Sequence, residues 1–146
     1  MFDEQTLCRL EERIKTSNMM QWLRLSVEAG DQGAIYHMGF CEEHIGNPVI
    51  RAIHGGVISC FLESAALLEA LAQAPQGTEI NIISTHISYL ASAKAKDIRA
   101  HIATAKFGRR MGFFEASAFQ DHQQAPIARA AIGIRLKRPE EQRLTP

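Results

Sequence analysis

Residues 54–66 read HGGVISCFLESAA, two consecutive glycines followed at once by an apolar run that holds a single carboxylate, Glu63. Glycines lack the side chain that keeps a ligand away from the backbone. A helix that begins just after them presents unpaired N–H groups, and its dipole favours negative charge there. This stretch therefore predicts a site for an electron-rich carbonyl oxygen at the start of a helix, with an acid nearby to act on it.

The apolar run predicts a long helix from about Gly56 to Gln73, ended by the proline and glycine of residues 74–77. The helix is apolar around most of its circumference, so we expect it to be buried. Glu63 lies about 120° around the helix from Glu69, and its neighbours three and four positions away are small or apolar. A carboxylate in such surroundings needs a partner or a function.

The segments before this helix predict a first helix from Asp3 to about Lys15 and then a hairpin, with strands over 20–28 and 34–41. The segments after it predict four strands, over Ile80–Leu90, Lys96–Lys106, Arg110–Gln120 and Pro126–Lys137. One antiparallel sheet of about six strands wrapped around one central helix is the economical arrangement, because the sheet needs a cover and the helix needs burial.

The expected architecture is therefore an α+β fold with an extra N-terminal helix. We expect a single domain over 1–146, with the N-terminal helix in 1–18 and a loose polar tail over 139–146. An open sheet of this kind leaves edges and part of the helix exposed, and dimerisation is the expected remedy.

Sixteen basic and sixteen acidic residues cancel, so no global field favours nucleic acid or an anionic membrane as a partner. No uninterrupted apolar segment approaches membrane-spanning length. The three cysteines are far apart and form no CxxC pair, and the acidic N-terminus does not resemble a signal peptide. We expect a cytoplasmic protein. The histidines lack metal-ligand spacing, so we expect no metal and no other cofactor.

Five features follow one another along the chain: Gly46-Asn47-Pro48, His54-Gly55-Gly56, Glu63, Tyr89-Leu90 and Phe107-Gly108-Arg109-Arg110. This pattern resembles the hot-dog-fold acyl-CoA thioesterases, and among them the phenylacetate-pathway and 4-hydroxybenzoyl-CoA thioesterase branch. The similarity covers about 20–138, with the elements in matching order. An acid nine residues after the histidine, inside the first long helix, makes the pattern more specific than His-Gly-Gly alone.

The resemblance implies hydrolysis of an acyl-CoA. The Gly55 N–H would face the thioester carbonyl oxygen, beside Gly56, and Glu63 would act as nucleophile or as the base that activates water. His54 is expected to orient the loop through a ring hydrogen bond, ahead of direct proton transfer. The resemblance also implies an active site at the interface of a homodimer, possibly within a dimer of dimers, with coenzyme A along the subunit boundary.

The chain departs from the family pattern at two positions. Members often carry an asparagine six residues before the histidine, where this chain has Pro48; Asn47 is the candidate for that role. Some members place a serine or threonine on the strand after the helix. Ile82 aligns there, with Ser84 and Thr85 close by, and Ser84 is the candidate for substrate binding.

The geometry of a helix separates the two central groups. Glu63 follows His54 by nine residues, which span roughly 13 Å along the axis. It cannot touch the Gly55 amide of its own chain, whereas a dimer that places one chain's Glu63 beside the other's Gly55 resolves the problem. Lys106, Arg109 and Arg110 surround Gly108 at a strand turn, and they are either a solvated turn or a site for the coenzyme A phosphates.

Two other functions fit the same sequence. A 3-hydroxyacyl thioester dehydratase needs a histidine base and an acid at one carbon, and His44 with Glu63 fits that pattern less well than His54-Gly55-Gly56 fits a thioesterase. A non-catalytic acyl-CoA-binding protein would keep the fold and bind without turnover.

Overall fold

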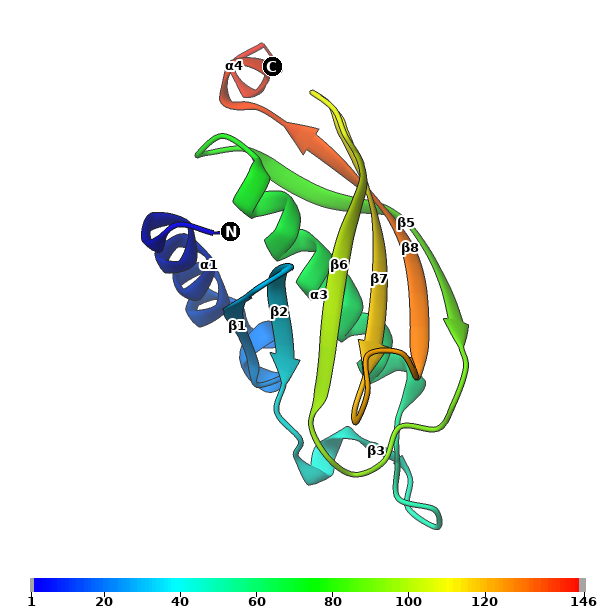
Figure 1. The fold of residues 1–146 in the computed structure, drawn as a ribbon. Helices are drawn as coiled ribbons and strands as arrows, with labels where there is room; N and C mark the ends of the chain where they lie inside the picture. Colours follow the sequence, from blue (N-terminus) through cyan, green and yellow to red (C-terminus); the bar gives the residue numbers. More distant parts are fainter. Residues whose placement is uncertain (1, 145–146) are drawn as a thin grey trace.

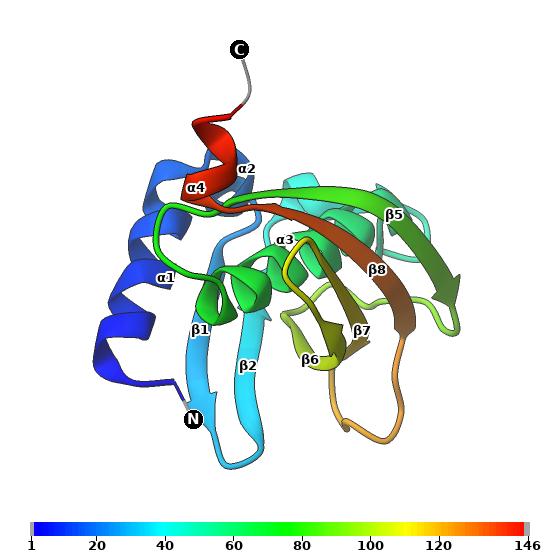
Figure 2. The ribbon, with the colours of Figure 1, turned by 90° about the horizontal axis from the view of Figure 1, so that it is seen from above.

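In the computed structural model, which describes residues 2–144, a six-stranded antiparallel sheet curves around one long helix, α3 (Gly55–Gln73) (Figures 1 and 2). The strand order is β1-β2-β6-β7-β8-β5. The strands are β1 (Leu25–Gly30), β2 (Gly33–Met38), β5 (Glu79–Tyr89), β6 (Ile98–Phe107), β7 (Met111–Phe119) and β8 (Ala128–Lys137). This architecture confirms the predicted α+β fold.

Helix α3 is buried because the sheet wraps most of its circumference. Its fully buried side chains include Phe61, Leu62 and Leu68. The length and composition of α3 would also let it cross a membrane, which we did not expect from the sequence, but 56% of its most apolar 18-residue stretch is buried inside the molecule. The core helix of a wrapped sheet passes the same test.

The inner face of the sheet supplies the rest of the core. In β8 the apolar residues at alternate positions from Ala128 to Leu136 are buried, whereas Arg129 and Arg135 are exposed on the other face, as the alternation predicted. β5 runs opposite in direction to α3 and pairs only with β8, so its other side is an open sheet edge (Figure 1).

The N-terminal region differs from the prediction at one point. α1 (Glu4–Thr16) matches the expected first helix and packs on α3, but a second short helix, α2 (Asn18–Trp22), takes the place of the expected start of the hairpin. The Oγ of Ser17 accepts the Met20 N–H and caps this helix. Arg24, with a φ of 49°, then turns the chain into β1.

The loop between the hairpin and α3 contains short regular elements. They are the 3-10 turn η1 (Glu42–His44) and the small β3 (Ile45–Asn47) and β4 (Ala52–Ile53) pair. In the predicted polar tail, Pro139–Gln142 forms a short helix, α4, and residues 145–146 lie outside the described residues.

Candidate active site

The first turn of α3 leaves one backbone donor free. Gly56 donates its N–H to Nδ1 of His54 at 2.9 Å, and Val57 and Ile58 donate theirs to the His54 carbonyl at 3.0 and 3.3 Å. Among the described residues, the Gly55 N–H has no acceptor. The sequence prediction that Gly55 offers a donor at a helix start is therefore consistent with the hydrogen bonding of this turn.

The segment around Gly46 packs closely against this turn. A Cβ on Gly46 would lie 2.6 Å from the His54 Cβ and 2.7 Å from its Cα, so only glycine permits the approach. His54 also donates its backbone N–H to the carbonyl of His44 at 2.9 Å. The side chain of Asn47 is used within its own turn, because its Oδ1 accepts the N–H groups of Val49 (3.1 Å) and Ile50 (3.4 Å).

Tyr89, the last residue of β5, closes over the same turn. Its hydroxyl donates to the Gly55 carbonyl at 2.8 Å. A Cβ on Gly55 would meet the Tyr89 ring carbons at 3.2 Å. The sequence did not predict this contact, because a tyrosine at a strand end carries no sign of which backbone group it contacts.

A hollow of about 370 Å³ opens beside Gly55 and Tyr89. Its walls are mostly apolar or small and include Ala52, Ile53, Ile58 and Leu90. An N–H without an acceptor at the edge of an apolar hollow suits a carbonyl oxygen, because no protein group already occupies that donor.

Glu63 lies on a half-buried stripe of α3, together with Ser59, Cys60 and Leu67. Among residues 2–144 its carboxylate has no hydrogen-bond or ion-pair partner. The other carboxylate of α3, Glu69, is engaged, because its Oε2 accepts the Tyr36 hydroxyl at 2.7 Å. Helical rise places Glu63 roughly 12 Å along the axis from Gly55, so one chain does not bring the two groups together.

The thiol of Cys60 is a poor nucleophile. Partial burial raises the pKa of this thiol, and the nearby charge of Glu63 raises it further. The thiolate, which is the reactive form, is therefore disfavoured at neutral pH.

The strand β5 presents Thr85, rather than Ser84, to α3. Ser84 pairs with Gly133, and its Oγ lies 2.5 Å from the position of a Cβ on that glycine, which places it on the outer face of the sheet. Thr85 pairs with the buried Ile132, so both side chains point toward α3. A β-bulge between Ile82 and Ser84 shifts the faces, which the alternation of the sequence does not reveal.

The Thr85 hydroxyl is unusual because it is buried without a hydrogen-bond partner among the described residues. Tyr89 contacts Gly55. Thr85 precedes Tyr89 by four strand residues, a distance of roughly 13 Å along β5. This distance is close to the advance along α3 from Gly55 to Glu63. β5 and α3 run in opposite directions (Figure 1). The two equal advances therefore put Thr85 at about the level of Glu63.

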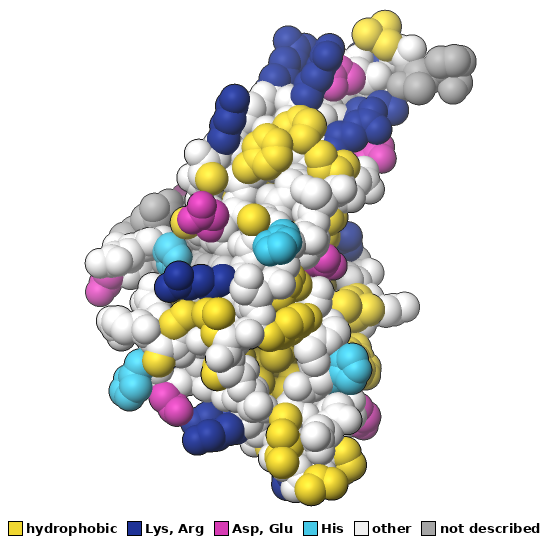
Figure 3. Space-filling model, turned by 90° about the vertical axis from the view of Figure 1, so that its right-hand side faces the viewer, with side chains coloured by type: hydrophobic (Ala, Val, Ile, Leu, Met, Phe, Trp, Pro, Cys, Tyr) yellow, Lys and Arg dark blue, Asp and Glu magenta, His cyan; other side chains and the backbone are white. Residues whose placement is uncertain are grey.

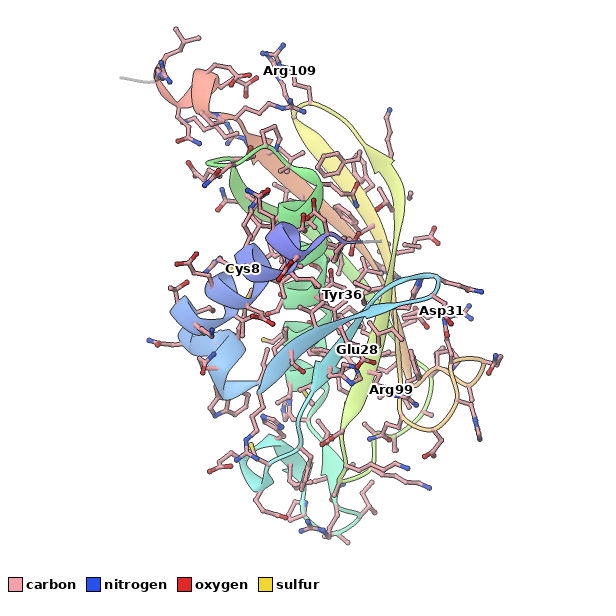
Figure 4. The ribbon with its side chains drawn as sticks, turned by 60° about the vertical axis from the view of Figure 1, so that its left-hand side comes forward. Cys8, Glu28, Asp31, Tyr36, Arg99 and Arg109 are labelled. Carbon is pink, nitrogen blue, oxygen red and sulfur yellow. The ribbon has the colours of Figure 1, made fainter. Side chains whose placement is uncertain are left out.

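The basic turn lies at the other end of the sheet. Lys106, Arg109 and Arg110 are exposed where β6 turns into β7, whereas α3 begins at the opposite end (Figures 1 and 4). Arg109 and Arg110 approach Glu141 of α4, with N···O distances of 3.5 and 3.7 Å. Within one chain these three residues are therefore not part of the Gly55 site.

A hollow of about 520 Å³ lies on the outer face of the sheet, away from α3, and is lined by His86, His101, Glu115 and Arg129 among others. It contains none of the site residues discussed above. Within residues 2–144 no group of three or more His, Cys, Asp or Glu side chains is arranged to hold a metal ion.

Residues 46–134 match the family model of the acyl-CoA thioesterase N-terminal domain. The chain belongs to this family. The matched segment runs from the Gly46 loop through α3 to β8, so it contains every element that builds the site. A comparison with curated proteins gave no match.

Solved structures agree with the assignment to the hot-dog thioesterases. A crystal structure of a thioesterase-superfamily protein is 26% identical, with a TM-score of 0.74, and the match covers 92% of this chain and 100% of that one. A phenylacetic acid degradation-related protein of Ralstonia eutropha JMP134 is 16% identical (TM-score 0.75; 86% and 98% covered). A Bacillus halodurans protein solved with CoA is 18% identical (TM-score 0.71; 90% and 83% covered).

The dehydratase alternative finds little support in the structure, because both ring nitrogens of His44 contact the backbone. His44 is fully buried, with Nδ1 facing the Cys41 N–H at 3.4 Å and Nε2 facing the Trp22 carbonyl at 3.0 Å. A ring with both nitrogens on backbone groups is not free to take a proton from a substrate carbon.

Proposed function

We propose that the protein hydrolyses an acyl-CoA thioester to the free acid and CoA. The Gly55 N–H donates to the thioester carbonyl oxygen, and Glu63 of a partner subunit acts as nucleophile or as general base. The observation that carries the proposal is that α3 holds one backbone donor and one half-buried carboxylate, each without a partner among the described residues.

The chemistry needs only these two groups because a thioester is already reactive. In the general-base form, Glu63 takes a proton from water as the oxygen attacks the carbonyl carbon. The negative charge that develops on the carbonyl oxygen is stabilised by the Gly55 N–H, and one such donor is typically worth ~10²–10³ in rate. The C–S bond then breaks, the thiolate leaves as CoA and takes up a proton, and the acid is released.

A second copy of the chain would bring a Glu63 carboxylate close to the Gly55 N–H. β5 is an open sheet edge, and the side of the molecule along β5 exposes large apolar residues, including Ile83, Tyr89 and Leu90, which are each at least half exposed. Figure 3 shows hydrophobic side chains gathered in a band down this side. Pairing there would cover the edge and the apolar surface, and we propose it as the arrangement that brings one chain's Glu63 to the other chain's Gly55.

The family and one relative support the proposed substrate class. The Bacillus halodurans protein was solved with CoA, and it has the same fold as this chain. The partnerless hydroxyl of Thr85, level with Glu63, supports a polar contact with the attacking water or the substrate on the acid side of the site.

The test is thiol release from short, medium, long and aryl acyl-CoA substrates, measured for the wild type, Glu63→Gln and Glu69→Gln. We expect wild-type turnover of at least one substrate, and a ~10²–10⁴-fold loss of kcat in Glu63→Gln. Glu69→Gln is the matched control on the same helix, since an amide oxygen still accepts the Tyr36 hydroxyl. Tight acyl-CoA binding without turnover would favour the non-catalytic alternative. Full activity of Glu63→Gln would exclude Glu63 as the nucleophile or general base.

A further inference from the structure

The hydrogen bond from Tyr89 to Gly55 links the end of β5 to the first residue of α3. The Oη–O distance is 2.8 Å, and the Tyr89 ring lies within 3.2 Å of the position that a Cβ on Gly55 would take. The tyrosine itself is 54% exposed, so this contact does not arise from packing in the core.

The contact acts on one peptide plane. The carbonyl of Gly55 and the N–H of Gly56 belong to the same planar unit. Tyr89 binds its carbonyl, and Nδ1 of His54 accepts its N–H at 2.9 Å. The unit lies between two glycines, which would otherwise leave it wide rotational freedom. Two hydrogen bonds at opposite ends therefore fix its orientation.

The free donor is on the preceding peptide plane. The Gly55 N–H shares its plane with the His54 carbonyl, which accepts the Val57 and Ile58 N–H groups. When the planes on both sides of the Gly55 Cα are held, the direction of the Gly55 N–H is fixed as well. Preorganised donors cost no reorganisation when charge develops on the substrate, which is why their orientation affects the rate more than the binding of substrate.

We infer that Tyr89 is a positioning residue, which aims the Gly55 N–H for thioester hydrolysis through its hydrogen bond to the Gly55 carbonyl. The inference rests on the proposed function for its catalytic consequence. The phenol itself acts through the backbone and takes no proton from the substrate.

The kinetic test compares Tyr89→Phe with Ser88→Ala. Tyr89→Phe keeps the ring and removes only the hydroxyl. Ser88→Ala removes a hydroxyl from the adjacent residue, which faces the outer side of the sheet opposite Arg129. We expect kcat to fall about 3- to 10-fold in Tyr89→Phe, the equivalent of one neutral hydrogen bond, with KM within twofold. Ser88→Ala should keep both constants. Unchanged kcat in Tyr89→Phe, or a change confined to KM, would overturn the inference.

A spectroscopic test separates this inference from the proposed function. In ¹⁵N-labelled protein, Tyr89→Phe should shift the amide resonances of Gly55 and Gly56 and leave those at the C-terminal end of α3 in place, whereas Ser88→Ala should shift neither glycine. If the wild type hydrolyses no acyl-CoA, the proposed function fails, and the glycine resonances alone decide whether Tyr89 orients this turn. Glycine resonances that do not move would refute the role of Tyr89 even in an active enzyme.

Discussion

The Nδ1 atom of His54 accepts the N–H of Gly56 at 2.9 Å, and this bond singles out the neighbouring Gly55 N–H as the one donor of the turn without an acceptor among the described residues. The histidine thus caps the first turn of α3 through its Nδ1 atom. Its contribution is to decide which backbone group remains available.

Replacing Gly55 by proline should remove the donor while keeping the helix. Gly55 is the first residue of α3, a position where proline is favoured because that N–H makes no helical bond, and His54 has the extended conformation that a following proline requires. Gly55→Ala is the matched control, because both variants place a Cβ 3.2 Å from the Tyr89 ring. Steady-state kinetics should show kcat ~10²–10³-fold lower in Gly55→Pro than in Gly55→Ala. Equal rates in the two variants would mean that this N–H is not used.

Asn47→Asp distinguishes a turn-holding residue from a catalytic one. A carboxylate can still accept the N–H groups of Val49 and Ile50, but it cannot donate as the amide NH₂ does. We expect kcat and the midpoint of thermal unfolding close to the wild-type values, with Asn47→Ala less stable. A large drop of kcat in a well-folded Asn47→Asp variant would restore the catalytic role that the sequence suggested.

Gly46→Ala should destabilise the protein and lower its activity together. The new Cβ would lie 2.7 Å from the Cα of His54, and a backbone atom cannot move aside as a flexible side chain can. Overpacking of this kind costs about 1–3 kcal/mol in the free energy of unfolding, measurable by urea denaturation. Pro48→Ala, an exposed change in the same loop, serves as the control. Wild-type stability of Gly46→Ala would show that the loop does not pack on His54 this closely.

Tyr36 predicts how stability changes in alkali. Burial, and then the charge of Glu69, raise the pKa of this phenol far above its ordinary value, and Tyr36 lies between β2 and α3 (Figure 4). Above about pH 10 the unfolded chain ionises Tyr36 and the folded protein does not, so the free energy of unfolding falls as the pH rises, by up to about 1.4 kcal/mol per pH unit.

Tyr36→Phe should remove that part of the decline between about pH 9 and pH 11, whatever stability it loses at neutral pH through the lost bond to Glu69. Identical slopes for the wild type and Tyr36→Phe in guanidinium unfolding would contradict the assigned burial of this group.

Much of the fold could be predicted because its periodicities are long and regular. Residues 55–73 are apolar around most of the helix because the sheet covers them, and β8 alternates because one of its faces packs on that helix. The structure confirms both patterns. Residues 20–22 misled the prediction because three residues cannot distinguish a strand from a helical turn. The Ser17 cap and the left-handed Arg24 decide that segment.

The site was harder to predict than the fold. Local sequence identified the Gly55 turn, since paired glycines directly before an apolar helix indicate a backbone that another group can approach closely. It could not show that Thr85 rather than Ser84 faces α3, because a single bulge reverses which residues of β5 point toward the helix. It also missed the link from Tyr89 to Gly55, a contact over 34 residues that only the packing of β5 on α3 creates.

Subunit complementation tests the shared site most directly. Gly55→Pro and Glu63→Ala chains with different affinity tags are co-expressed, and the mixed dimer is isolated through both tags. If one chain's Gly55 works with the other's Glu63, each parent dimer is inactive, whereas the mixed dimer keeps one intact site of two and should show roughly half of the wild-type kcat per dimer. A purified mixed dimer as inactive as its parents would contradict the account.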